Sequence, residues 1–537
     1  MLGSMQDFPL LVTSLIDHAE RENGPREVVT RWADGSLTRS DWATVALESR
    51  KFAQMLERMG IQRGDRVATI AMNHGHHISS WYGTAGMGGI LHTINPRLHA
   101  DQLVYVLNHA GDRVLFFDKM FQPIVEGIKD RLETVEKFIL FDDGQFDGEG
   151  DYPTYRELID AEDGDFAWVQ LDERDPCGLC YTSGTTGNPK GVLYEHRSNV
   201  LHAITSLQPA VFDLSARSVM LPIVPMFHAN AWGIPFAAAA VGAKLVCSCS
   251  NDGGVLWKLF REEKVTFSAG VPTVWLAMFA DMDANGGDYG SLERVVIGGS
   301  AAPRAMIERL KKTGITVAHA WGMTETSPIG TTGARPHDWS ALDFDAQVDV
   351  IAKQGRPPYG VELRTIGENG ELPRDGKSSG RLQVRGPWIM KRYFRAEEDA
   401  SGDDNWFDTG DVSVLYPDGT MQITDRAKDV IKSGGEWISS IELENAVMGC
   451  DGVAEAAAVG VHHPKWDERP LLLVVRKPGS GLGAEDILDH LQGKVAKWWL
   501  PDEIKFVDEL PHTATGKILK RALRDEYSDY KLETVDD

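Results

Sequence analysis

The sequence predicts an α/β protein in which a large N-terminal domain, made of two doubly wound lobes and a β-rich lobe, precedes a small α+β C-terminal domain. Three observations lead to this fold class. The chain has 537 residues, more than a single hydrophobic core supports. Short β-rich runs alternate with amphipathic segments over most of its length. Hydrophobic residues make up 42% and charged residues 25%, as is typical of folded globular proteins.

The clearest alternation of strands and helices lies between about residues 171 and 321. AKLVCSC precedes VLWKLFREEK, TFSAGVP precedes TVWLAMFADM, and RVVIGG precedes PRAMIERLKKTG, which ITVAHAW follows. In the helix after RVVIGG, Pro303 lies at the start, an apolar stripe follows, and Gly314 ends it. Such repetition indicates parallel sheets covered by helices on both faces, with ligands at the carboxyl ends of the strands.

The remaining segments complete the predicted order of domains. The first 150 residues repeat the alternation, with RVATIAM and RVLFFD as strands and LVYVLNHAG as a helix, and we expect a second doubly wound lobe. From Gly355 short β runs and turns predict the β-rich lobe. After residue 425 we expect strands at AEAAAVGV and LLLVVR and a helix at ILDHLQGKVAKWW. We place the boundary at Asp425 or Arg426, which gives domains of residues 1–425 and 426–537.

The charge and the apolar segments exclude two classes of partner. With 79 acidic and 55 basic residues the formal charge is −24, and no run of Lys and Arg offsets it, so we expect no nucleic-acid partner. A small anion is still compatible, because a few lysines and backbone N–H groups can reverse the local field. No window approaches the ~20 apolar residues of a membrane span, and the first residues do not show the basic segment and long apolar stretch of a secretory signal.

The five cysteines are sparse and odd in number, which fits a reducing compartment and predicts a cytoplasmic protein. Cys177 and Cys180 form a C-x-x-C pair. A metal or redox site would need a second ligand pair or a thioredoxin-like context, and neither is present in the sequence. We therefore expect both cysteines to be small buried residues of a strand.

Residues 181–191, YTSGTTGNPKG, group hydroxyl side chains, glycines and one lysine as an anion-binding loop would. The run is not a Walker A loop, because Pro189 stands where a glycine is needed and Gly191 follows Lys190 where a hydroxyl is needed. We expect this loop to hold the outer phosphates of a nucleotide, and the alternative is a solvated turn. Its candidate phosphate-binding residues are Thr182, Ser183, Gly184, Thr185, Thr186, Gly187 and Lys190.

This loop resembles the phosphate-binding signature of the adenylate-forming superfamily, which includes acyl-CoA synthetases, luciferases and nonribosomal adenylation domains. Further motifs follow in that family's order over nearly the whole chain: GGSAAP from 298, WGMTETSP from 321, WFDTGD from 406, DRAKDVIKSGGEWISSIELE from 425 and PHTATGKILK from 511. The resemblance implies transfer of AMP from ATP to a carboxylate, and then transfer of the acyl group to coenzyme A (CoA). It also implies a mobile C-terminal domain.

The resemblance assigns roles to residues of the nucleotide site. Lys517 bridges the carboxylate and the α-phosphate, Thr324 contacts the α-phosphate, and Glu325 holds Mg²⁺ with ATP. Asp411 accepts hydrogen bonds from the ribose hydroxyls, as an ionised carboxylate can, with Arg426 beside it and Asp425 as the hinge. Without the surrounding motifs, Lys517 would be a solvated surface lysine, Glu325 a surface glutamate and Asp411 a residue of a turn. The predicted adenine-side positions are Gly299, Ser300, Ala301, Ala320, Trp321, Gly322 and Met323.

Two further segments are assigned to the second substrate and to the acid. Ser433, Gly434, Gly435, Glu436 and Trp437 resemble the CoA tunnel, where glycines allow a narrow pantetheine arm to approach the backbone; a flexible turn is the alternative.

The acid pocket is predicted at His228, Trp232, Gly298 and Gly299. His228 occupies the position where the carboxylate enters, without a general-base role. Trp232 either narrows the cavity toward short or medium chains or is a core residue.

The pocket segment FHANAWG contains no acidic residue to meet an α-ammonium group, so we expect an acid without one. Within the family, the chain resembles the ligases of medium-chain fatty acids and, still more, those of methylmercaptopropionate, a product of dimethylsulfoniopropionate breakdown. A serine hydrolase is disfavoured because Ala302 breaks the G-x-S-x-G pattern at GGSAA. A nucleotide-binding protein without turnover is a third class. Relatives are often dimers, so a homodimer is an open expectation.

Overall fold

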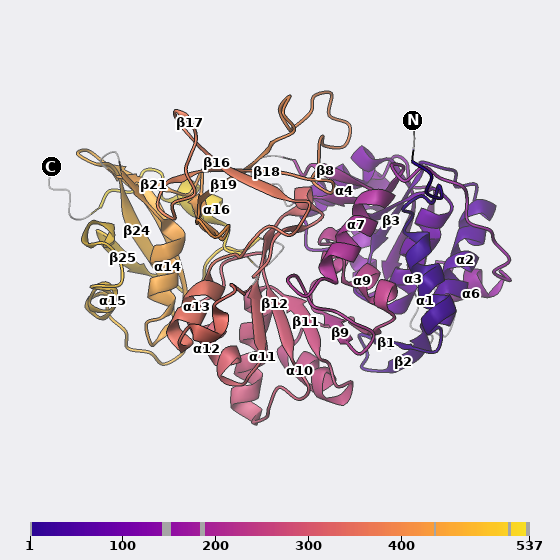
Figure 1. Ribbon diagram of the computed structural model, residues 1–537, viewed down its shortest axis with the longest axis horizontal. Coiled ribbons are helices and arrows are strands. Elements are labelled where there is room, and N and C mark those ends of the chain that lie inside the picture. Colours follow the sequence, from indigo (N-terminus) through magenta and orange to yellow (C-terminus); the bar gives the residue numbers. More distant parts are fainter. Residues whose placement is uncertain are drawn as a thin grey trace.

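The computed structural model describes residues 3–141, 152–182, 188–333, 335–433, 436–513 and 517–532. The N-terminal part contains two mostly parallel sheets covered by helices, and an antiparallel sheet packs beside them. A smaller α+β unit follows in the chain (Figure 1). This arrangement confirms the predicted fold class.

The six-stranded sheet has the order β6-β5-β3-β4-β7-β8, and all its pairs are parallel except β7 with β8. Its strands are β3 (Arg66–Ile70), β4 (Ile90–Thr93), β5 (Asp112–Asp118), β6 (Lys137–Phe141), β7 (Pro176–Tyr181) and β8 (Gly191–Glu195). In β5, Val114 and Phe116 face one apolar core while Leu115 and Phe117 face another. This alternation is what a strand covered on both faces requires.

The seven-stranded sheet has the order β13-β12-β11-β9-β10-β1-β2, and only the β1–β2 pair is antiparallel. Its strands are β1 (Glu27–Arg31), β2 (Leu37–Asp41), β9 (Val219–Pro222), β10 (Lys244–Ser248), β11 (Phe267–Gly270), β12 (Arg294–Ile297) and β13 (Thr316–His319). Val296 of β12 faces the core shared with the other sheet, whereas Val295 and Ile297 face the outer helices.

The two lobes exchange strands, which corrects the prediction that residues before 150 and after 171 form separate lobes. β1 and β2 join the sheet of β9–β13, and β7 and β8 join the sheet of β3–β6. Local patterns predict the strands but not their partners, because these pairings join distant segments, such as Leu91 with Gly178 and Val28 with Leu245. As a consequence, the exit of the YTSGTTGNPKG loop lies at the edge of the six-stranded sheet.

Helices cover both sheets, and one layer is shared between them. The shared core contains residues of α1 (Thr13–Asn23), α2 (Trp42–Arg58), α3 (Gly75–Gly86), α6 (Tyr155–Asp160), α7 (His196–Ser206) and α9 (Ile234–Val241). The outer face of the six-stranded sheet carries α4 (Ala100–Ala110), η1 (Lys119–Phe121), α5 (Gln122–Ile128) and η2 (Lys129–Arg131). The outer face of the seven-stranded sheet carries α10 (Gly253–Glu262), α11 (Pro272–Asn285), α12 (Arg304–Lys312) and α13 (Phe344–Ala352).

The β-rich lobe is a five-stranded antiparallel sheet of order β17-β16-β18-β19-β20. Its strands are β16 (Glu362–Gly367), β17 (Gly370–Glu371), β18 (Ser379–Arg385), β19 (Phe407–Leu415) and β20 (Met421–Arg426). Its core reaches Val192 and Tyr194 of β8 and Trp321, so it packs beside the phosphate loop. The connecting elements are α8 (Ala229–Trp232), β14 (Trp321–Gly322), η3 (Thr324–Thr326), β15 (Ile329–Thr331) and η4 (Trp339–Ala341).

The C-terminal unit is a five-stranded mixed sheet with helices on both faces. It contains β21 (Ile431–Ser433), β22 (Glu436–Ile438), α14 (Ser440–Met448), β23 (Val453–His463), β24 (Asp467–Arg476), α15 (Ala484–Leu491), η5 (Lys497–Trp499), β25 (Glu503–Phe506) and α16 (Lys520–Glu526). The helix predicted over residues 487–499 was too long. It ends at Leu491, because Gly493 adopts a left-handed φ of 75° and a 3₁₀ turn follows.

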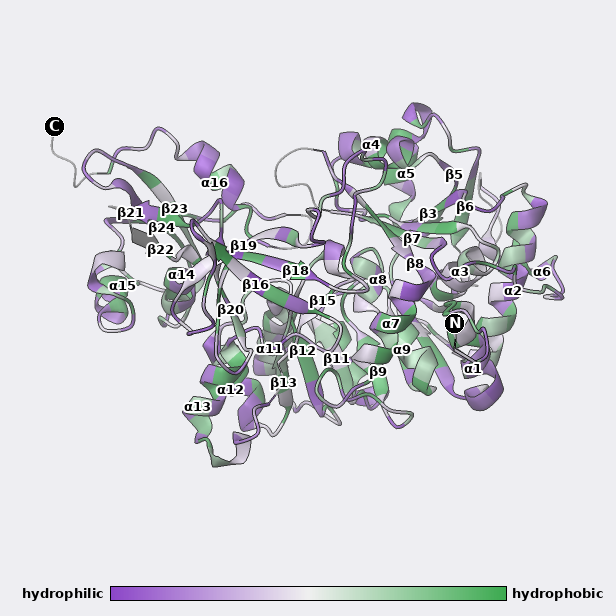
Figure 2. Ribbon diagram, turned by 45° about the horizontal axis from the view of Figure 1, so that its top comes forward, coloured by the Kyte–Doolittle hydropathy of each residue, from purple (hydrophilic) through white to green (hydrophobic). Residues whose placement is uncertain are grey.

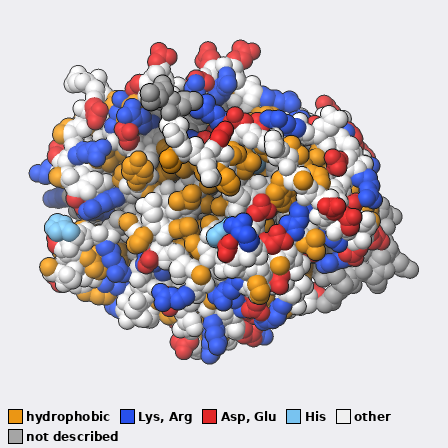
Figure 3. Space-filling view, turned by 45° about the vertical axis from the view of Figure 1, so that its right-hand side comes forward, with side chains coloured by type: hydrophobic (Ala, Val, Ile, Leu, Met, Phe, Trp, Pro, Cys, Tyr) orange, Lys and Arg blue, Asp and Glu red, His pale blue; other side chains and the backbone are white. Residues whose placement is uncertain are grey.

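Burial agrees with these layers. The strands of the parallel sheets carry apolar residues, whereas hydrophilic residues lie on outer elements such as α16 (Figure 2). Figure 3 shows one face on which apolar side chains gather across the middle, with charged side chains around them. Cys177 and Cys180 are free and buried in β7, which confirms their predicted strand placement. In the described ranges, no helix has the length and apolarity needed to cross a membrane.

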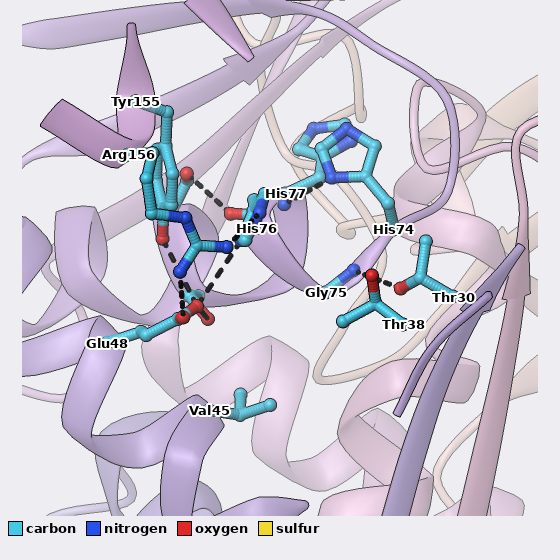
Figure 4. A network of polar contacts seen from close by, with 12 residues as sticks. Thr30, Thr38, Val45, Glu48, His74, Gly75, His76, His77, Tyr155 and Arg156 are labelled. Atoms are coloured by element: carbon cyan, nitrogen blue, oxygen red, sulfur yellow. Dashed lines mark hydrogen bonds and ion pairs between the residues drawn. The ribbon is translucent and has the colours of Figure 1, made fainter. Parts of the chain in front are cut away.

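A buried polar network joins α2, α3 and α6 (Figure 4). The Glu48 carboxylate accepts hydrogen bonds from His76 Nδ1 at 3.4 Å, from Ser79 Oγ at 3.4 Å and from the Tyr155 hydroxyl at 3.5 Å. Arg156 pairs with Glu48 at 3.9 Å and donates to His76 Nε2 at 3.3 Å. These partners hold the pKa of Glu48 below its usual value although burial, the largest influence, raises it. The network therefore keeps an ionised carboxylate between three helices.

Replacing Glu48 by alanine is expected to reduce the free energy of unfolding by about 3 kcal/mol, because its buried donors lose their acceptor. The first thermal transition should fall by about 3 °C in a calorimetric scan, because a unit of this size has a large entropy of unfolding. Glu57→Ala, at an exposed position of the same helix, is the control and should change stability by less than about 0.5 kcal/mol. Equal effects of the two substitutions would show that the network does not stabilise the lobe.

Candidate active site

Lys517 lies against the glycine pair that follows β12. A Cβ atom placed on Gly299 would be 3.8 Å from Lys517 Cε, although Lys517 belongs to the C-terminal unit. Burial, and to a smaller extent the charge of Arg426, lowers the pKa of Lys517 to about 8, and Asp411 opposes both. The predicted catalytic lysine and the residues predicted to bind the nucleotide are therefore close neighbours in this structure.

Asp411 lies within β19, not in a turn, and is 1% exposed. Its carboxylate accepts a hydrogen bond from Trp321 Nε1 at 2.8 Å and pairs with Arg426 Nε at 2.7 Å. The strand register produces this pair, because Asp411 of β19 is directly opposite Arg426 of β20. The structure thus joins three of the predicted nucleotide-site residues in one contact cluster.

Trp321 occupies the predicted adenine side and is 7% exposed. A Cβ atom on Gly330 would lie 2.2 Å from its ring, so the absence of a side chain there makes room for the indole. Gly322 is equally constrained, since a Cβ there would lie 1.6 Å from the Pro328 carbonyl oxygen. Whether the Trp321 ring stacks on adenine stays a prediction.

Glu325 lies in the short helix η3 and is 5% exposed. Its Oε1 atom accepts a hydrogen bond from the Tyr393 hydroxyl at 2.7 Å, and its carbonyl accepts one from Met390 N at 2.8 Å. Burial raises the pKa of Glu325, and the Tyr393 hydrogen bond opposes this rise. The carbonyl of neighbouring Thr324 accepts a bond from the Tyr194 hydroxyl at 2.8 Å. The turn that carries both candidate residues is therefore fixed by two tyrosines.

The phosphate loop is described only at its base. Thr182 N–H donates to the Lys190 carbonyl at 2.9 Å, and Lys190 N–H donates to Thr182 Oγ1 at 3.2 Å, so the loop is closed at its two ends. Lys190 is exposed, and its Nζ atom lies 4.8 Å from the centroid of the Tyr393 ring. The predicted residues outside the described ranges are Ser183, Gly184, Thr185, Thr186 and Gly187.

The predicted acid pocket is built on an unusual left-handed turn. Ala229, Asn230, Ala231 and Trp232 have φ values of 44°, 55°, 54° and 56°, and each costs about 1–2 kcal/mol for a residue with a side chain. The Asn230 side chain accepts a hydrogen bond from Trp81 Nε1 at 3.1 Å, which helps to hold the turn. Strain of this kind tends to occur at functional sites.

This turn directs the predicted pocket residue Trp232 toward the glycine pair. The Trp232 ring lies 3.1 Å from a Cβ placed on Gly298 and 3.8 Å from one on Gly299. Burial lowers the pKa of His228 to about 3, with smaller contributions from Lys517 and Arg97. His228 is thus neutral and near Lys517, which lies against Gly299, and Trp232 approaches the same glycine.

The adenine-side loop between β12 and α12 is supported by a histidine that the sequence analysis missed. His319 Nε2 accepts from Ala302 N–H at 3.3 Å, and Nδ1 donates to the Ala352 carbonyl at 3.0 Å. Both ring nitrogens are engaged, so His319 is not placed to activate the hydroxyl of Ser300 as a hydrolase would require. Ser300 and Ala301 lie in this loop, Ala320 follows β13, and Met323 precedes η3.

The hinge position is tied to the C-terminal unit. The Asp425 carboxylate is fully buried and accepts from Ser440 N at 2.6 Å and from Ser440 Oγ at 2.8 Å. Lys520 Nζ donates to the same Ser440 hydroxyl at 2.6 Å and pairs with Glu444 at 2.7 Å. Asp425 is the next-to-last residue of β20, and the domain boundary there stays a prediction.

The predicted CoA segment is not part of this cluster. Ser433 is 6% exposed, its hydroxyl accepts from Arg469 Nη1 at 3.2 Å, and it pairs with Asp467 in the sheet. These partners belong to the C-terminal unit. Gly434, Gly435 and the side chains of Glu436 and Trp437 lie outside the described residues.

The tyrosines and His319 carried no signal that sequence reasoning could use. Tyr194 lies within a strand, Tyr393 lies in the connection between β18 and β19, and His319 ends a strand. None of them stands at a diagnostic spacing from another polar residue, so only the folded chain reveals their contacts. Among the described residues, no group of three or more His, Cys, Asp or Glu side chains is arranged to hold a metal ion.

Comparison with known families agrees with this geometry. Residues 16–394 match the AMP-binding enzyme family, and residues 442–517 match the AMP-binding enzyme C-terminal domain. The first match alone spans more than half of the chain. The protein therefore belongs to the AMP-binding enzyme family, which confirms the resemblance drawn from its motifs.

Individual relatives show which members of that family the chain is similar to. The chain is 47% identical to a 3-methylmercaptopropionyl-CoA ligase of Ruegeria lacuscaerulensis over 535 residues, covering 98% of this chain and 99% of that protein. It is 46% identical to a medium-chain-fatty-acid–CoA ligase of Ectopseudomonas oleovorans over 540 residues, covering 99% of both chains. The fold is similar to that of ATP-bound MatB from Rhodopseudomonas palustris, with a TM-score of 0.81, 24% identity, and coverage of 98% of this chain and 100% of that chain.

Proposed function

We propose that the protein is an ATP- and CoA-dependent acid–thiol ligase that forms an acyl-CoA through an acyl-adenylate. One observation carries the proposal: a lysine of the C-terminal unit, Lys517, lies against Gly299, within electrostatic reach of Asp411 and Arg426. In such an enzyme the carboxylate attacks the α-phosphorus of ATP and pyrophosphate leaves. The CoA thiolate then attacks the acyl carbonyl, and AMP leaves.

The first step needs positive charge between two anions. Two unit charges ~4 Å apart at an effective dielectric constant near 20 repel by ~4 kcal/mol. The Lys517 ammonium offsets this repulsion where the acid and the α-phosphate meet, and Thr324 donates to the same phosphate. Lys190 and its loop attract the two outer phosphates and hold them as they leave. Asp411 accepts hydrogen bonds from the ribose hydroxyls, and Arg426 keeps its carboxylate oriented.

The donor chemistry of Glu325 fits a magnesium ion that arrives with ATP. Its oxygen is a hard ligand, the carboxyl group is nearly buried, and one oxygen is already fixed by Tyr393. Mg²⁺ in nucleotide enzymes commonly uses one or two carboxylates and completes its shell with phosphates and water. When bound, the ion supplies charge neutralisation on the phosphates. The protein itself contributes the Glu325 carboxylate, which it holds in a fixed orientation for the ion.

The second step requires a different arrangement of the C-terminal unit. The CoA segment around Ser433 has its contacts within that unit, while Lys517 occupies the acid site. We propose that residues 426–537 turn about Asp425, withdrawing Lys517 and bringing the Gly434 and Gly435 segment to the acyl-adenylate. The bonds from Ser440 to Asp425 are the ones that this turn changes.

We propose 3-methylthiopropionate (methylmercaptopropionate) as the acid, as a step of dimethylsulfoniopropionate catabolism. A medium- or short-chain fatty acid is the second candidate. Two relatives at 47% and 46% identity carry these two specificities in their names. The Trp232 ring against Gly298 and Gly299 supports a short cavity.

The direct test is CoA-dependent AMP production from ATP with propionate, butyrate, hexanoate, octanoate, 3-methylthiopropionate and benzoate. The highest kcat/KM is expected for 3-methylthiopropionate or for a fatty acid of similar length. A clear preference for benzoate or for a long chain would overturn the substrate assignment. ATP binding without acid-dependent pyrophosphate release would instead support a nucleotide-binding protein without turnover.

Replacing Trp232 by alanine is expected to shift the preference toward longer acids. Each additional buried methylene contributes about 0.8 kcal/mol, so admitting two of them should raise the kcat/KM ratio of octanoate to hexanoate roughly fifteenfold. Trp257→Ala, in a partly exposed position of α10, is the matched control. An unchanged chain-length profile in Trp232→Ala would assign Trp232 to the core and not to the pocket wall.

The assembly and location remain part of the proposal. A homodimer is consistent with the apolar side chains gathered on the face in Figure 3, and a cytoplasmic location with five cysteines that are all free. Light scattering coupled to size exclusion distinguishes a dimer from a monomer.

A further inference from the structure

The segment from Met390 to Phe394 connects the phosphate loop to the turn that carries Glu325. Met390 N–H donates to the Glu325 carbonyl at 2.8 Å, and Phe394 N–H donates to the Gly191 carbonyl at 2.8 Å. Gly191 is the first residue of β8 and directly follows Lys190. One short stretch of backbone therefore fixes the distance between two motifs that lie more than a hundred residues apart in the sequence.

Tyr393, in the middle of this segment, contacts the functional side chain of each motif. Its hydroxyl donates to Glu325 Oε1 at 2.7 Å. Its ring lies beneath Lys190 Nζ, which is 4.8 Å from the ring centroid. A hydrogen bond to a carboxylate and an ammonium over an aromatic face are both charge-dependent contacts. The same side chain thus holds one anionic and one cationic group of the nucleotide site.

We propose that Tyr393 is a positioning residue that presets Lys190 and Glu325 for ATP, its ring acting on the lysine and its hydroxyl on the carboxylate. The inference rests on the proposed function, because that function assigns Lys190 to the outer phosphates and Glu325 to the metal. Without Tyr393, the exposed Lys190 side chain samples many rotamers and must be ordered when the nucleotide binds. Likewise, the Glu325 carboxylate loses the donor that fixes its orientation.

A purely structural role is the competing explanation, because Tyr393 also packs against the core of the β-rich lobe. The two explanations predict different effects for the hydroxyl and for the ring of Tyr393. If Tyr393 only packs, removal of the hydroxyl should weaken ATP binding equally with and without Mg²⁺, or not at all. If it presets both groups, removal of the hydroxyl should affect only the part of ATP binding that depends on Mg²⁺.

The experiment measures ATP binding by titration calorimetry, in excess Mg²⁺ and in EDTA, for Tyr393→Phe and Tyr393→Leu. We expect Tyr393→Phe to weaken binding about tenfold with Mg²⁺ and to leave binding in EDTA unchanged. Tyr393→Leu should show the same loss with Mg²⁺ and a further loss of about threefold in both conditions, as the ring contact with Lys190 disappears. In a Glu325→Gln background, Tyr393→Phe should have no further effect.

Tyr152→Phe is a closely matched control. The Tyr152 hydroxyl donates to Glu126 at 2.6 Å, and Lys129 Nζ lies 5.7 Å from its ring centroid, in another part of the chain. It should leave ATP binding unchanged in both conditions. Equal losses in Mg²⁺ and EDTA for Tyr393→Phe, or none, would overturn the inference, with circular dichroism establishing that the variant is folded. Failure of the wild-type protein to bind ATP would overturn the proposed function itself.

Discussion

Lys517→Ala is expected to lower acid-dependent exchange of pyrophosphate into ATP by about a thousandfold. The Lys517 side chain lies against Gly299, where the acid and the α-phosphate are proposed to meet, so the substitution removes charge that only the adenylation step uses. Thioester formation from supplied acyl-AMP and CoA should fall far less, because the lysine is withdrawn in that step. Both half-reactions can be measured on the same preparation.

The pH dependence of the same reaction gives an independent readout. The pKa of Lys517 is lowered to about 8, so its cation is present below that pH and is lost as the pH rises through it. Adenylation measured as kcat/KM should therefore decline above about pH 8, and Lys517→Arg should remove this decline. Among the described residues, the charges that act on Lys517 are those of Arg426 and Asp411, while the nearby His228 is neutral. Lys477→Ala, at an exposed position of the C-terminal unit, is the control. Equal losses in the two half-reactions of Lys517→Ala would contradict the proposed role of Lys517 in adenylation.

Asp411→Asn is expected to weaken ATP binding by roughly a hundredfold or more, because two hydrogen bonds from ribose hydroxyls to a charged acceptor are reduced to weaker ones. The substitution keeps the shape of the side chain, and an oxygen remains to accept from Trp321 Nε1. Calorimetric titration with ATP measures the loss. Asp408→Asn on the same strand, where Asp408 pairs with Arg381 at 3.0 Å, should bind ATP as the wild type does.

A nucleotide analogue separates the ribose contact from a general disturbance of the site. Wild-type protein should bind 2′-deoxy-ATP or 3′-deoxy-ATP more weakly than ATP, whereas Asp411→Asn should bind all three with similar affinity. If the variant still discriminated against the deoxy analogues as strongly as the wild type, the ribose would have another partner.

The sequence predicts the local elements well and their assembly less well. Strands such as β3, β5, β12 and β24 and helices such as α4 and α12 follow from apolar period, proline and glycine within a few residues. The exchange of β1, β2, β7 and β8 between the sheets could not be predicted, because it depends on pairing between distant segments. The predicted helix at residues 487–499 is longer than α15, because the apolar pattern continues past Gly493 and suggests more helix than the structure contains.

The candidate site shows a similar division. Motif resemblance predicted Lys517, Glu325, Asp411 and Arg426, and the structure brings them into one cluster. The residues that orient this cluster, such as Tyr393 and His319, were missed because each acts through one or two tertiary contacts. The left-handed turn at Ala229 to Trp232 was also missed, since neither alanine nor tryptophan favours a positive φ.

The pairing of β1 with β10 determines how long β1 stays unpaired on one edge while the chain is synthesised. During synthesis, roughly 200 residues separate the end of β1 from its parallel partner, an interval of about 10–40 s at the usual rate of translation. Val28 and Val29 of β1 are buried in the finished protein, and during that time the strand that carries them has no β10 to pair with. The nascent N-terminal half therefore exposes one unpaired edge of an apolar strand, the kind of edge that can pair with another chain.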